Sequence, residues 1–250
     1  MNLTIACKYF SPRGGAQTFL INFVRCLLAD GHRVRVVTMQ AEGQMAGVET
    51  RLVSLPPVSK TLRDVLFARA ARRILSREDC DVSLGEQKTW GADVVRPGGG
   101  VHIEYIRQIV RSYPSAPMRA LRSLTRRLSP KERLNLYIER RLYADSRLRL
   151  VIANSHLVRR HLLRHYPALG GRIAVVYNGT DCARFSPDLR RHRGAVRAEL
   201  AIPEDALVGV FVSYDLRRKG LPTVLRALSI LQRKGGPPVY ALVVGRRKPW

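Results

Sequence analysis

The chain lacks any apolar run close to the ~20 residues that a membrane-spanning helix requires. Its first residues, MNLTIACKYF, contain no basic segment and no small-residue cleavage site, so the sequence indicates no secretory signal peptide. The four cysteines, Cys7, Cys26, Cys80 and Cys182, form no C-x-x-C pair and have no histidine at ligand spacing. This pattern argues against a zinc site and a disulfide framework. We therefore expect buried thiols in a cytoplasmic protein.

Acidic residues are scarce. The 250 residues include 19 Asp and Glu against 44 Lys and Arg, which gives a formal net charge of +25. Such a balance implies an anionic partner: nucleic acid, acidic lipid or a phosphorylated substrate. Aromatic residues are only 7% of the chain, and no recognition helix or zinc finger is visible, so nucleic acid is disfavoured.

Strand-length apolar runs alternate with segments of helical periodicity. The expected strands lie at 3–7, 33–38, 49–55, 80–85, 148–154, 172–178, 207–213 and 239–245. This alternation predicts an α/β fold with a parallel, Rossmann-like sheet covered on both faces. The polar segment 178–194 lacks helical periodicity and is expected to be a linker. It would separate an N-terminal domain, 1–177, from an incomplete second Rossmann-like domain, 195–250.

Glycines precede the first expected helix, whose apolar stripe runs from Ala16 to Leu28. Gly14 and Gly15 could admit a phosphate to the backbone N–H groups at the helix start, or could simply form a tight turn. The pair matches neither G-x-G-x-x-G nor the Walker A pattern, so a dinucleotide fold is not supported.

Two further turns contain residues suited to chemistry. Arg217, Arg218 and Lys219 follow an expected strand and could clamp a diphosphate, or could form a solvated basic turn. His102 follows three glycines at a helix start, where it could bind a sugar hydroxyl or move a proton, or could merely cap and pack.

The basic charge is concentrated in residues 101–175, which hold 16 Lys or Arg against four acidic residues. Within them, MRALRSLTRRL places apolar residues on one helical face and Arg119, Arg122, Arg126 and Arg127 mostly off it. Such a helix could lie in the headgroup region of an anionic membrane. Alternatively, its apolar face could pack on the domain.

Taken together, four motifs resemble glycosyltransferase family 4, the retaining enzymes of the two-domain GT-B fold. They are SPRGGAQTFLINFVRCLLADGHRVRVVT, VIANSHLVRRHLLRHY, VVYNGTDCARFSP, and the Lys219-Gly220 pair that opens a helix. RPGGGVHIEYIR looks closest to members that extend the lipopolysaccharide core or a related lipid-linked glycan. The resemblance covers the chain from end to end.

The resemblance implies a nucleotide-sugar donor and a glycolipid or lipopolysaccharide acceptor, with no metal or other cofactor. Arg218, Lys219 and His102 would be catalytic, the two cations neutralising the departing nucleoside diphosphate. Contacts to the donor would come from the following residues: Gly14, Gly15, Arg217, Asn178 and Gly179. Arg119, Arg122, Arg126 and Arg127 would meet the membrane.

The chain differs from the family pattern in two places. Ser213-Tyr214 replaces a usual Gly-Arg, and a later motif of two glutamates does not occur. Two functions therefore stay open. One is hexose transfer to a lipid-linked glycan or lipopolysaccharide core by a peripheral protein at the inner face of the cytoplasmic membrane. The other is an inactive remnant that binds anionic membrane or glycolipid through its basic N-terminal domain.

Overall fold

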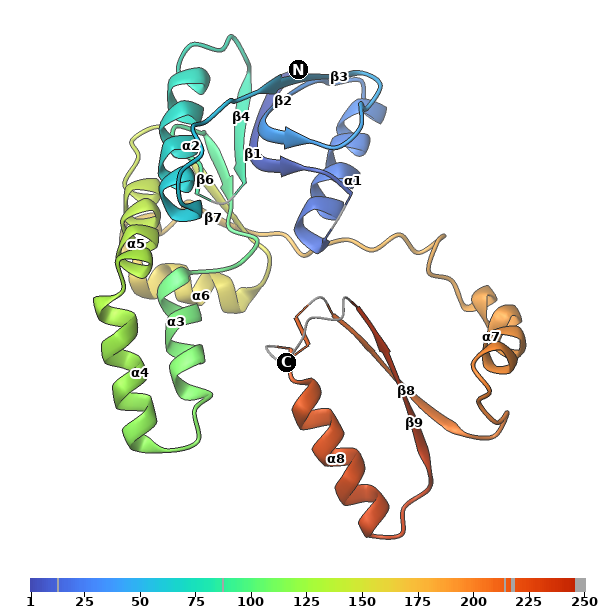
Figure 1. The fold of residues 1–250 in the computed structure, drawn as a ribbon. Helices are drawn as coiled ribbons and strands as arrows, with labels where there is room; N and C mark the ends of the chain where they lie inside the picture. The colour runs from blue at the N-terminus through green and yellow to red at the C-terminus, as the bar shows by residue number, and fades with distance from the viewer. Residues whose placement is uncertain (13, 87, 214, 217–218, 246–250) are drawn as a thin grey trace. The chain divides into compact units, whose positions relative to one another are not determined.

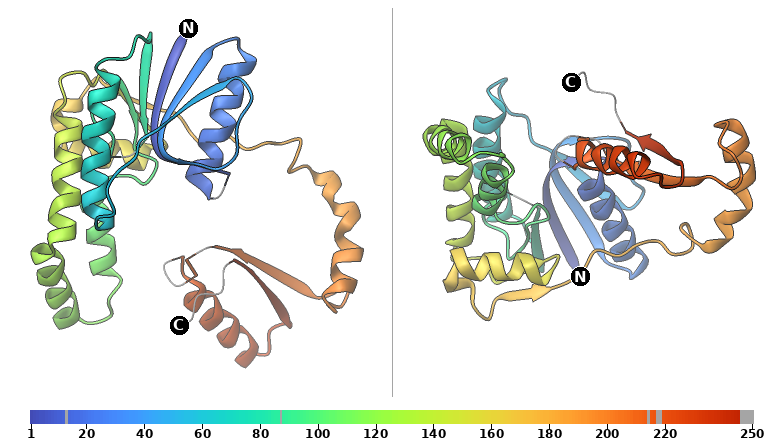
Figure 2. Two further views of the ribbon diagram at one scale, coloured as in Figure 1. Left: turned by 45° about the horizontal axis from the view of Figure 1, so that its top comes forward. Right: turned by 90° about the horizontal axis from the view of Figure 1, so that it is seen from below.

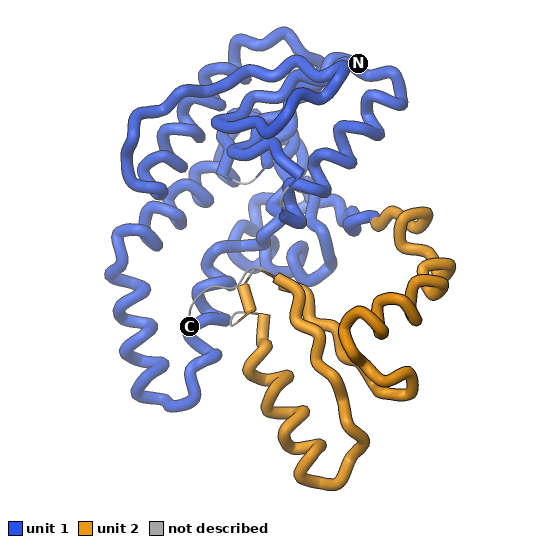
Figure 3. Tube along the Cα trace, turned by 45° about the vertical axis from the view of Figure 1, so that its right-hand side comes forward, with its two compact units in different colours: residues 1–179 blue, residues 180–250 orange. Residues whose placement is uncertain are grey.

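The computed structural model describes residues 1–12, 14–86, 88–213, 215–216 and 219–245. The chain divides into two compact units, Met1–Gly179 and Thr180–Trp250 (Figure 3). This division falls at the start of the segment 178–194, which the sequence predicts to be a linker.

Unit 1 contains a seven-stranded sheet in the order β3-β2-β1-β4-β5-β6-β7, in which every pairing is parallel. The strands are β1 (Asn2–Phe10), β2 (Arg33–Ala41), β3 (Val48–Leu52), β4 (Val82–Glu86), β5 (Val94–Arg96), β6 (Leu150–Ala153) and β7 (Ile173–Val175). The α/β class with a parallel Rossmann-like sheet is confirmed. The sequence analysis did not predict β5, a strand of three residues that lies in a segment rich in glycine and polar residues.

The helices of unit 1 lie between the strands. They are α1 (Gly15–Ala29), α2 (Lys60–Leu75), α3 (His102–Arg111), α4 (Ala116–Leu128), α5 (Pro130–Tyr143), α6 (His156–His165) and the short 3₁₀ turn η1 (Pro167–Leu169). Helix α1 lies on one side of the sheet, and α2 and α5 lie side by side on the other (Figures 1 and 2). Helices α3 and α4 form a hairpin that extends past the sheet (Figure 1).

The core of unit 1 has two halves, one on each face of the sheet. On β1, Ile5 and Cys7 belong to the half beneath α1, whereas Ala6 belongs to the half beneath α2 and α5. Alternate residues of a strand point to opposite faces, and a parallel sheet buried on both faces needs apolar side chains at nearly every position. This explains why the strands read as continuous apolar runs.

The expectation of buried thiols is correct for Cys7 and wrong for Cys26 and Cys182, which are exposed. Cys26 lies off the apolar stripe of α1, and Cys182 lies in the polar segment that begins unit 2. Cys80 has intermediate exposure.

Unit 2 contains a parallel pair of strands, β8 (Leu207–Val212) and β9 (Val239–Val244), joined through helix α8 (Leu221–Arg233). The 3₁₀ helix η2 (Pro187–His192) and α7 (Arg193–Glu199) precede them. Among the described residues of unit 2, only Leu221 is a buried apolar side chain. Val210 and Val212 are 61% and 71% exposed, because two strands and one helix enclose little volume.

Candidate active site

The carboxyl edge of the sheet in unit 1 gathers the polar residues of the candidate site. The strand order reverses between β1 and β4, and ligands of open α/β sheets bind outside the carboxyl ends of strands at such a switch point. The turn after β1 holds Gly14, and Glu86 ends β4. The loop after β5 leads through three glycines to His102.

Helix α1 begins at this edge without a capping side chain. Gly14 occupies the N-cap position with φ of 104°, a conformation that L side chains rarely adopt, and no side chain of the described residues caps the helix there. The first N–H groups of a helix have no acceptor within the helix and attract anions. A Cβ atom added to Gly15 would meet no atom within 4 Å. The helix start is therefore open at Gly15, whereas at Gly14 the Gln17 Oε1 atom lies 2.8 Å from the position of an added Cβ.

Arg96, which the sequence analysis did not single out, joins three parts of this edge. It is 3% exposed, and its Nη1 donates to Glu86 Oε1 at 2.8 Å. Its Nη2 donates to Asn178 Oδ1 at 2.6 Å, and its Cζ lies 3.5 Å from the ring centroid of Phe19 in α1. Burial raises the pKa of the Glu86 carboxyl, and the attraction of Arg96 partly offsets this. Arg96 thus links α1, β4 and the segment that contains Asn178.

A second buried ionic group lies beside Lys88, just after β4. The buried Asp64 of α2 accepts from Lys8 Nζ at 2.8 Å and from Lys88 Nζ at 2.9 Å. Burial alone would raise the pKa of Asp64, but the two ammonium groups outweigh burial and lower it. Lys88 has φ of 62° and also donates to Asn135 Oδ1 at 2.6 Å. These contacts hold a strained backbone at the edge of the sheet.

His102 is the first residue of α3, and two buried glutamates of α5 hold it. Its backbone N–H donates to Glu139 Oε2 at 2.7 Å, and its Nε2 lies 2.6 Å from Glu132 Oε2. Burial opposes ionisation of Glu132, yet hydrogen bonds from His102 and Arg126 lower its pKa, so the carboxylate accepts the Nε2 proton. In the imidazole tautomer that donates through Nε2, Nδ1 is the acceptor.

His102 lines a cavity of about 230 Å³ at this edge. The lining residues are Lys88, Pro97, Gly99, Gly100, His102, Tyr105, Asn135, Glu139, Leu142 and Tyr143. Burial raises the pKa of Glu139, which also accepts from the Tyr166 hydroxyl at 2.8 Å. Glu139 therefore holds the first turn of α3 in place and contributes a polar wall, so that the cavity presents hydrogen-bonding groups suited to hydroxyls.

Helix α4 presents its apolar side to solvent. No residue of α4 is buried, and the exposed fractions are 46% for Met118, 61% for Leu121, 54% for Leu124 and 65% for Leu128. The alternative in which this face packs on the domain is therefore wrong for these residues. Pro130 opens α5, and the residue before a proline disfavours the helical conformation, so α4 ends at Leu128.

The four arginines of α4 differ in their contacts. Arg119 donates to the carbonyls of Tyr113 and Pro114, and Arg122 lies over the Tyr113 ring at 5.0 Å. Arg126 pairs with Glu132. Within the described chain, the Arg127 side chain makes no ion pair or hydrogen bond, and of the four arginines Arg126 is the one paired with a carboxylate.

In unit 2, Lys219 lies in the turn after β8, and Gly220 follows in the left-handed conformation at the N-cap of α8. Lys219 is exposed, and its ammonium has no partner among the described residues. The predicted donor contacts Arg217 and Arg218 lie outside the described residues, as does Tyr214. Gly179 ends unit 1 in open space.

Of the predicted site residues in unit 1, Gly14 and Asn178 lie on loops, and Gly15 and His102 open helices, at the carboxyl edge of one sheet. Sequence reasoning missed the charged residues that hold these loops: Lys8, Asp64, Glu86, Lys88, Arg96, Glu132 and Glu139. Two signals were available: a charged residue at a strand end, as in Arg96 before the glycines, and an acidic residue among apolar helix positions, as in Asp64.

Glu104 joins helix α3 to the end of helix α6. This buried carboxylate of α3 has its Oε1 2.6 Å from His165 Nε2 and 2.9 Å from Arg107 Nη1. The hydrogen bond to His165 lowers its pKa from 4.5, and burial only partly opposes this. The contact fixes α3, and hence the cavity wall, against the end of α6.

We expect this carboxylate to make stability depend on pH. Its folded pKa is lower than its unfolded value near 4.5, so its stabilising effect is present above that value and is lost as the pH falls through the folded pKa. Urea unfolding between about pH 3 and pH 6 should show a shallower loss of stability for Glu104→Gln than for the parent chain. The exposed Glu199→Gln is the control. Parallel curves for all three proteins would contradict the assignment.

In the described part of the chain, no helix is long and apolar enough to span a membrane. No group of three His, Cys, Asp or Glu residues suited to a metal ion occurs among the described residues.

An open parallel sheet covered by helices on both faces defines unit 1 as a Rossmann-like unit. The sequence profile described as Glycosyltransferase Family 4 matches residues 13–184. The chain belongs to this family, as its motifs suggested.

The chain is similar to longer proteins. A probable transglycosylase of Burkholderia thailandensis is 29% identical over 252 residues, covering 98% of this chain and 62% of that protein. A D-inositol 3-phosphate glycosyltransferase of Streptomyces avermitilis is 38% identical over 81 residues, which is 32% of this chain and 17% of that protein.

Solved structures share the fold. WaaG, a glycosyltransferase involved in lipopolysaccharide biosynthesis, matches 99% of this chain and 64% of its own with a TM-score of 0.74 at 20% identity. A glycosyltransferase from Rickettsia africae matches 98% of this chain and 60% of its own chain, with a TM-score of 0.60 at 16% identity. The chain thus spans about three fifths of the length of the three proteins that match nearly all of it.

Proposed function

We propose that this protein transfers a hexose from a nucleotide-sugar to a lipid-linked glycan or lipopolysaccharide core at the inner face of the cytoplasmic membrane. The observation that carries the proposal is the open start of α1: an uncapped helix N-terminus behind Gly14 and Gly15, at the switch point of a family 4 chain. Backbone N–H groups there suit donor phosphates or the donor sugar.

The proposed roles of the other residues follow from their surroundings. His102 Nδ1 accepts a hydrogen bond from a sugar hydroxyl in the cavity, and Glu132 sets the imidazole tautomer. Asn178, held by Arg96, and Gly179 contact the donor. Lys219, with Arg217 and Arg218, neutralises the departing nucleoside diphosphate in place of a metal ion, so the reaction needs no cofactor.

The reaction is tested by measuring nucleoside diphosphate release from a panel of UDP- and GDP-sugars, with and without truncated lipopolysaccharide. Acceptor-dependent release with one donor supports transfer. No release with any pair removes the enzyme proposal and leaves the alternative, a protein that binds anionic membrane or glycolipid without turnover.

Gly15→Ala tests the donor position directly. Its Cβ would meet no protein atom within 4 Å, and alanine favours a helix, so folding should be unaffected. If a phosphate or sugar occupies that space, donor affinity should fall by about tenfold or more, measured by calorimetric titration of the nucleotide-sugar.

Gly194→Ala in α7 is the matched control, because its Cβ also meets nothing within 4 Å. Unchanged donor affinity in Gly15→Ala would place the donor elsewhere.

The proposal of membrane contact is supported by the exposed apolar side of α4. A helix with this side uncovered and arginines around it can insert its apolar residues among lipid headgroups. Leu121→Asp/Leu124→Asp should reduce binding to phosphatidylglycerol vesicles by at least about tenfold, because it removes two inserted side chains. Co-sedimentation at two salt concentrations measures this effect, and binding of the parent chain should weaken with salt.

Leu157→Asp on α6 is a suitable control because Leu157 is likewise half exposed. Equal vesicle binding by the α4 variant and the control would contradict the proposed contact, as would equal binding of the parent chain to neutral vesicles.

A further inference from the structure

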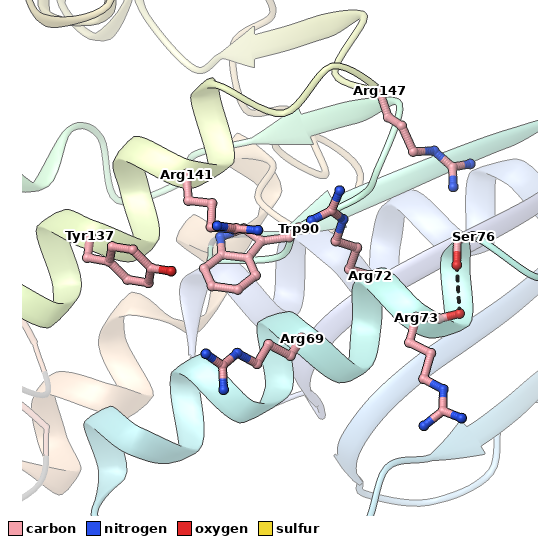
Figure 4. A pocket seen from close by; sticks show the side chains of 8 residues that line it. All are labelled: Arg69, Arg72, Arg73, Ser76, Trp90, Tyr137, Arg141 and Arg147. Carbon is pink, nitrogen blue, oxygen red and sulfur yellow. Dashed lines mark hydrogen bonds between the residues drawn. The ribbon is translucent and has the colours of Figure 1, made fainter.

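A second pocket, of about 460 Å³, lies between α2 and α5 (Figure 4). Its lining consists of five arginines, a serine and two aromatic residues: Arg69, Arg72, Arg73, Ser76, Trp90, Tyr137, Arg141 and Arg147. Ser76 and Arg147 follow the two helices, on the way to β4 and β6. The pocket therefore lies toward the amino ends of the strands, away from the candidate active site.

The arginines of this pocket have few anionic partners. Arg72 Nε lies 3.9 Å from Asp145 Oδ2, a buried carboxylate that also accepts from the Gly91 N–H at 3.1 Å. Across the described residues, the guanidinium groups of Arg69, Arg73, Arg141 and Arg147 make no ion pair or side-chain hydrogen bond. Four cations thus surround one opening without the carboxylates that usually accompany such a cluster.

The negative charge at the ends of α2 and α5 balances only part of the positive charge of these arginines. Arg72 and Arg73 lie in the last turn of α2 and Arg141 in the last turn of α5, where the helix dipole favours cations. Each helix end carries about half a negative charge, and Asp145 adds one more. Against five guanidinium groups, this leaves about three positive charges at the pocket. The excess attracts an anion of matching charge.

The floor of the pocket is rigid. The indole N–H of Trp90 donates to the Ile138 carbonyl at 3.0 Å, and the side chain is 2% exposed. Arg141 lies over its ring at 5.3 Å, and Tyr137 meets it edge-on at 6.0 Å (Figure 4). This cation–π contact holds the Arg141 guanidinium at the pocket, where its N–H groups can meet the oxygens of a phosphate.

We propose that this pocket binds a phosphorylated anion, through one or more phosphate groups that carry about two or more negative charges. Its volume suits a small polyphosphate or a phosphorylated headgroup, and planar guanidinium groups bind phosphate through two hydrogen bonds at once. The same chemistry occurs in a free polyphosphate and in a phosphomonoester lipid. The site is separate from the proposed transfer reaction and stands whether or not that reaction occurs.

The test uses tripolyphosphate as the free probe and the full chain, by calorimetric titration at physiological salt. Arg69→Ala/Arg141→Ala should lower its affinity at least about tenfold, since each lost charge-assisted hydrogen bond weakens binding by about that factor. The matched control, Arg25→Ala/Arg190→Ala, removes the same charge from exposed positions and should stay within about twofold. Thermal unfolding of the variants verifies that they fold.

A lipid arm distinguishes the source. Vesicles of phosphatidylcholine with phosphatidic acid are compared for the parent chain and both double variants, all with α4 unchanged. If the pocket variant loses vesicle binding and the control variant does not, the site is assigned to a lipid phosphate. If the pocket variant loses tripolyphosphate binding but keeps vesicle binding, the site is assigned to a free polyphosphate. The proposal is overturned if the pocket variant matches the control in both arms, or if sulfate at equal ionic strength competes fully with tripolyphosphate.

Discussion

Replacing Lys219 by alanine is expected to lower the turnover rate of sugar transfer by about 100- to 1,000-fold, as removal of one preorganised charge from a developing anion does in other enzymes. The Lys219 ammonium is exposed and has no partner among the described residues, so its loss should change the free energy of unfolding by less than about 0.5 kcal/mol. The measurement is nucleoside diphosphate release at saturating donor and acceptor.

Lys234→Ala provides the control for this prediction. Lys234 is an exposed cation at the other end of α8, so its removal changes the net charge equally. Lys219→Arg should recover part of the rate because the positive charge is kept. If Lys219→Ala retains at least a third of the parent rate, Lys219 does not stabilise the leaving group.

Replacing Arg96 by methionine is expected to destabilise unit 1 by about 3 kcal/mol, because it leaves the Glu86 carboxylate largely buried without its partner. For a unit of this size, such a loss lowers the melting temperature by roughly 6–12 °C. It also frees Asn178 Oδ1 and removes the guanidinium from the Phe19 ring. Thermal and urea unfolding measure the effect.

A second substitution separates the lost pair from lost packing. In Glu86→Gln/Arg96→Met no buried charge is left unpaired, so the double variant should be more stable than Arg96→Met alone. The exposed Arg25→Met is the control for the change of residue type. A double variant less stable than Arg96→Met would show that Arg96 acts mainly through its packing.

The fold could be predicted because local signals determine it. The parallel sheet follows from apolar runs buried on both faces, and α1 follows from the stripe between Ala16 and Leu28 and from Gly31, which adopts φ of 78° after the helix. Strand β5 could not be predicted, since its three residues form a strand only when β4 and β6 lie on either side.

The candidate site was predicted where backbone geometry marks it and missed where distant charges meet. Gly14, Gly15 and the glycines before His102 are visible as turns in the sequence. The hydrogen-bond partners of Arg96 are separated from it by 10 and 82 positions in the sequence. The two lysines that bind Asp64 are separated from it by 56 and 24 positions. No periodicity reports such pairings, because they depend on which loops the sheet order brings together.

Glu132 has contacts on two sides, since one oxygen faces His102 at the cavity and the other faces Arg126 on the helix with the exposed leucines. If lipid phosphates draw Arg126 away, the carboxylate loses its contact with the guanidinium and keeps only the contact with His102. Docking at a bilayer would then change the surroundings of His102, the histidine proposed to bind the sugar, through a single side chain.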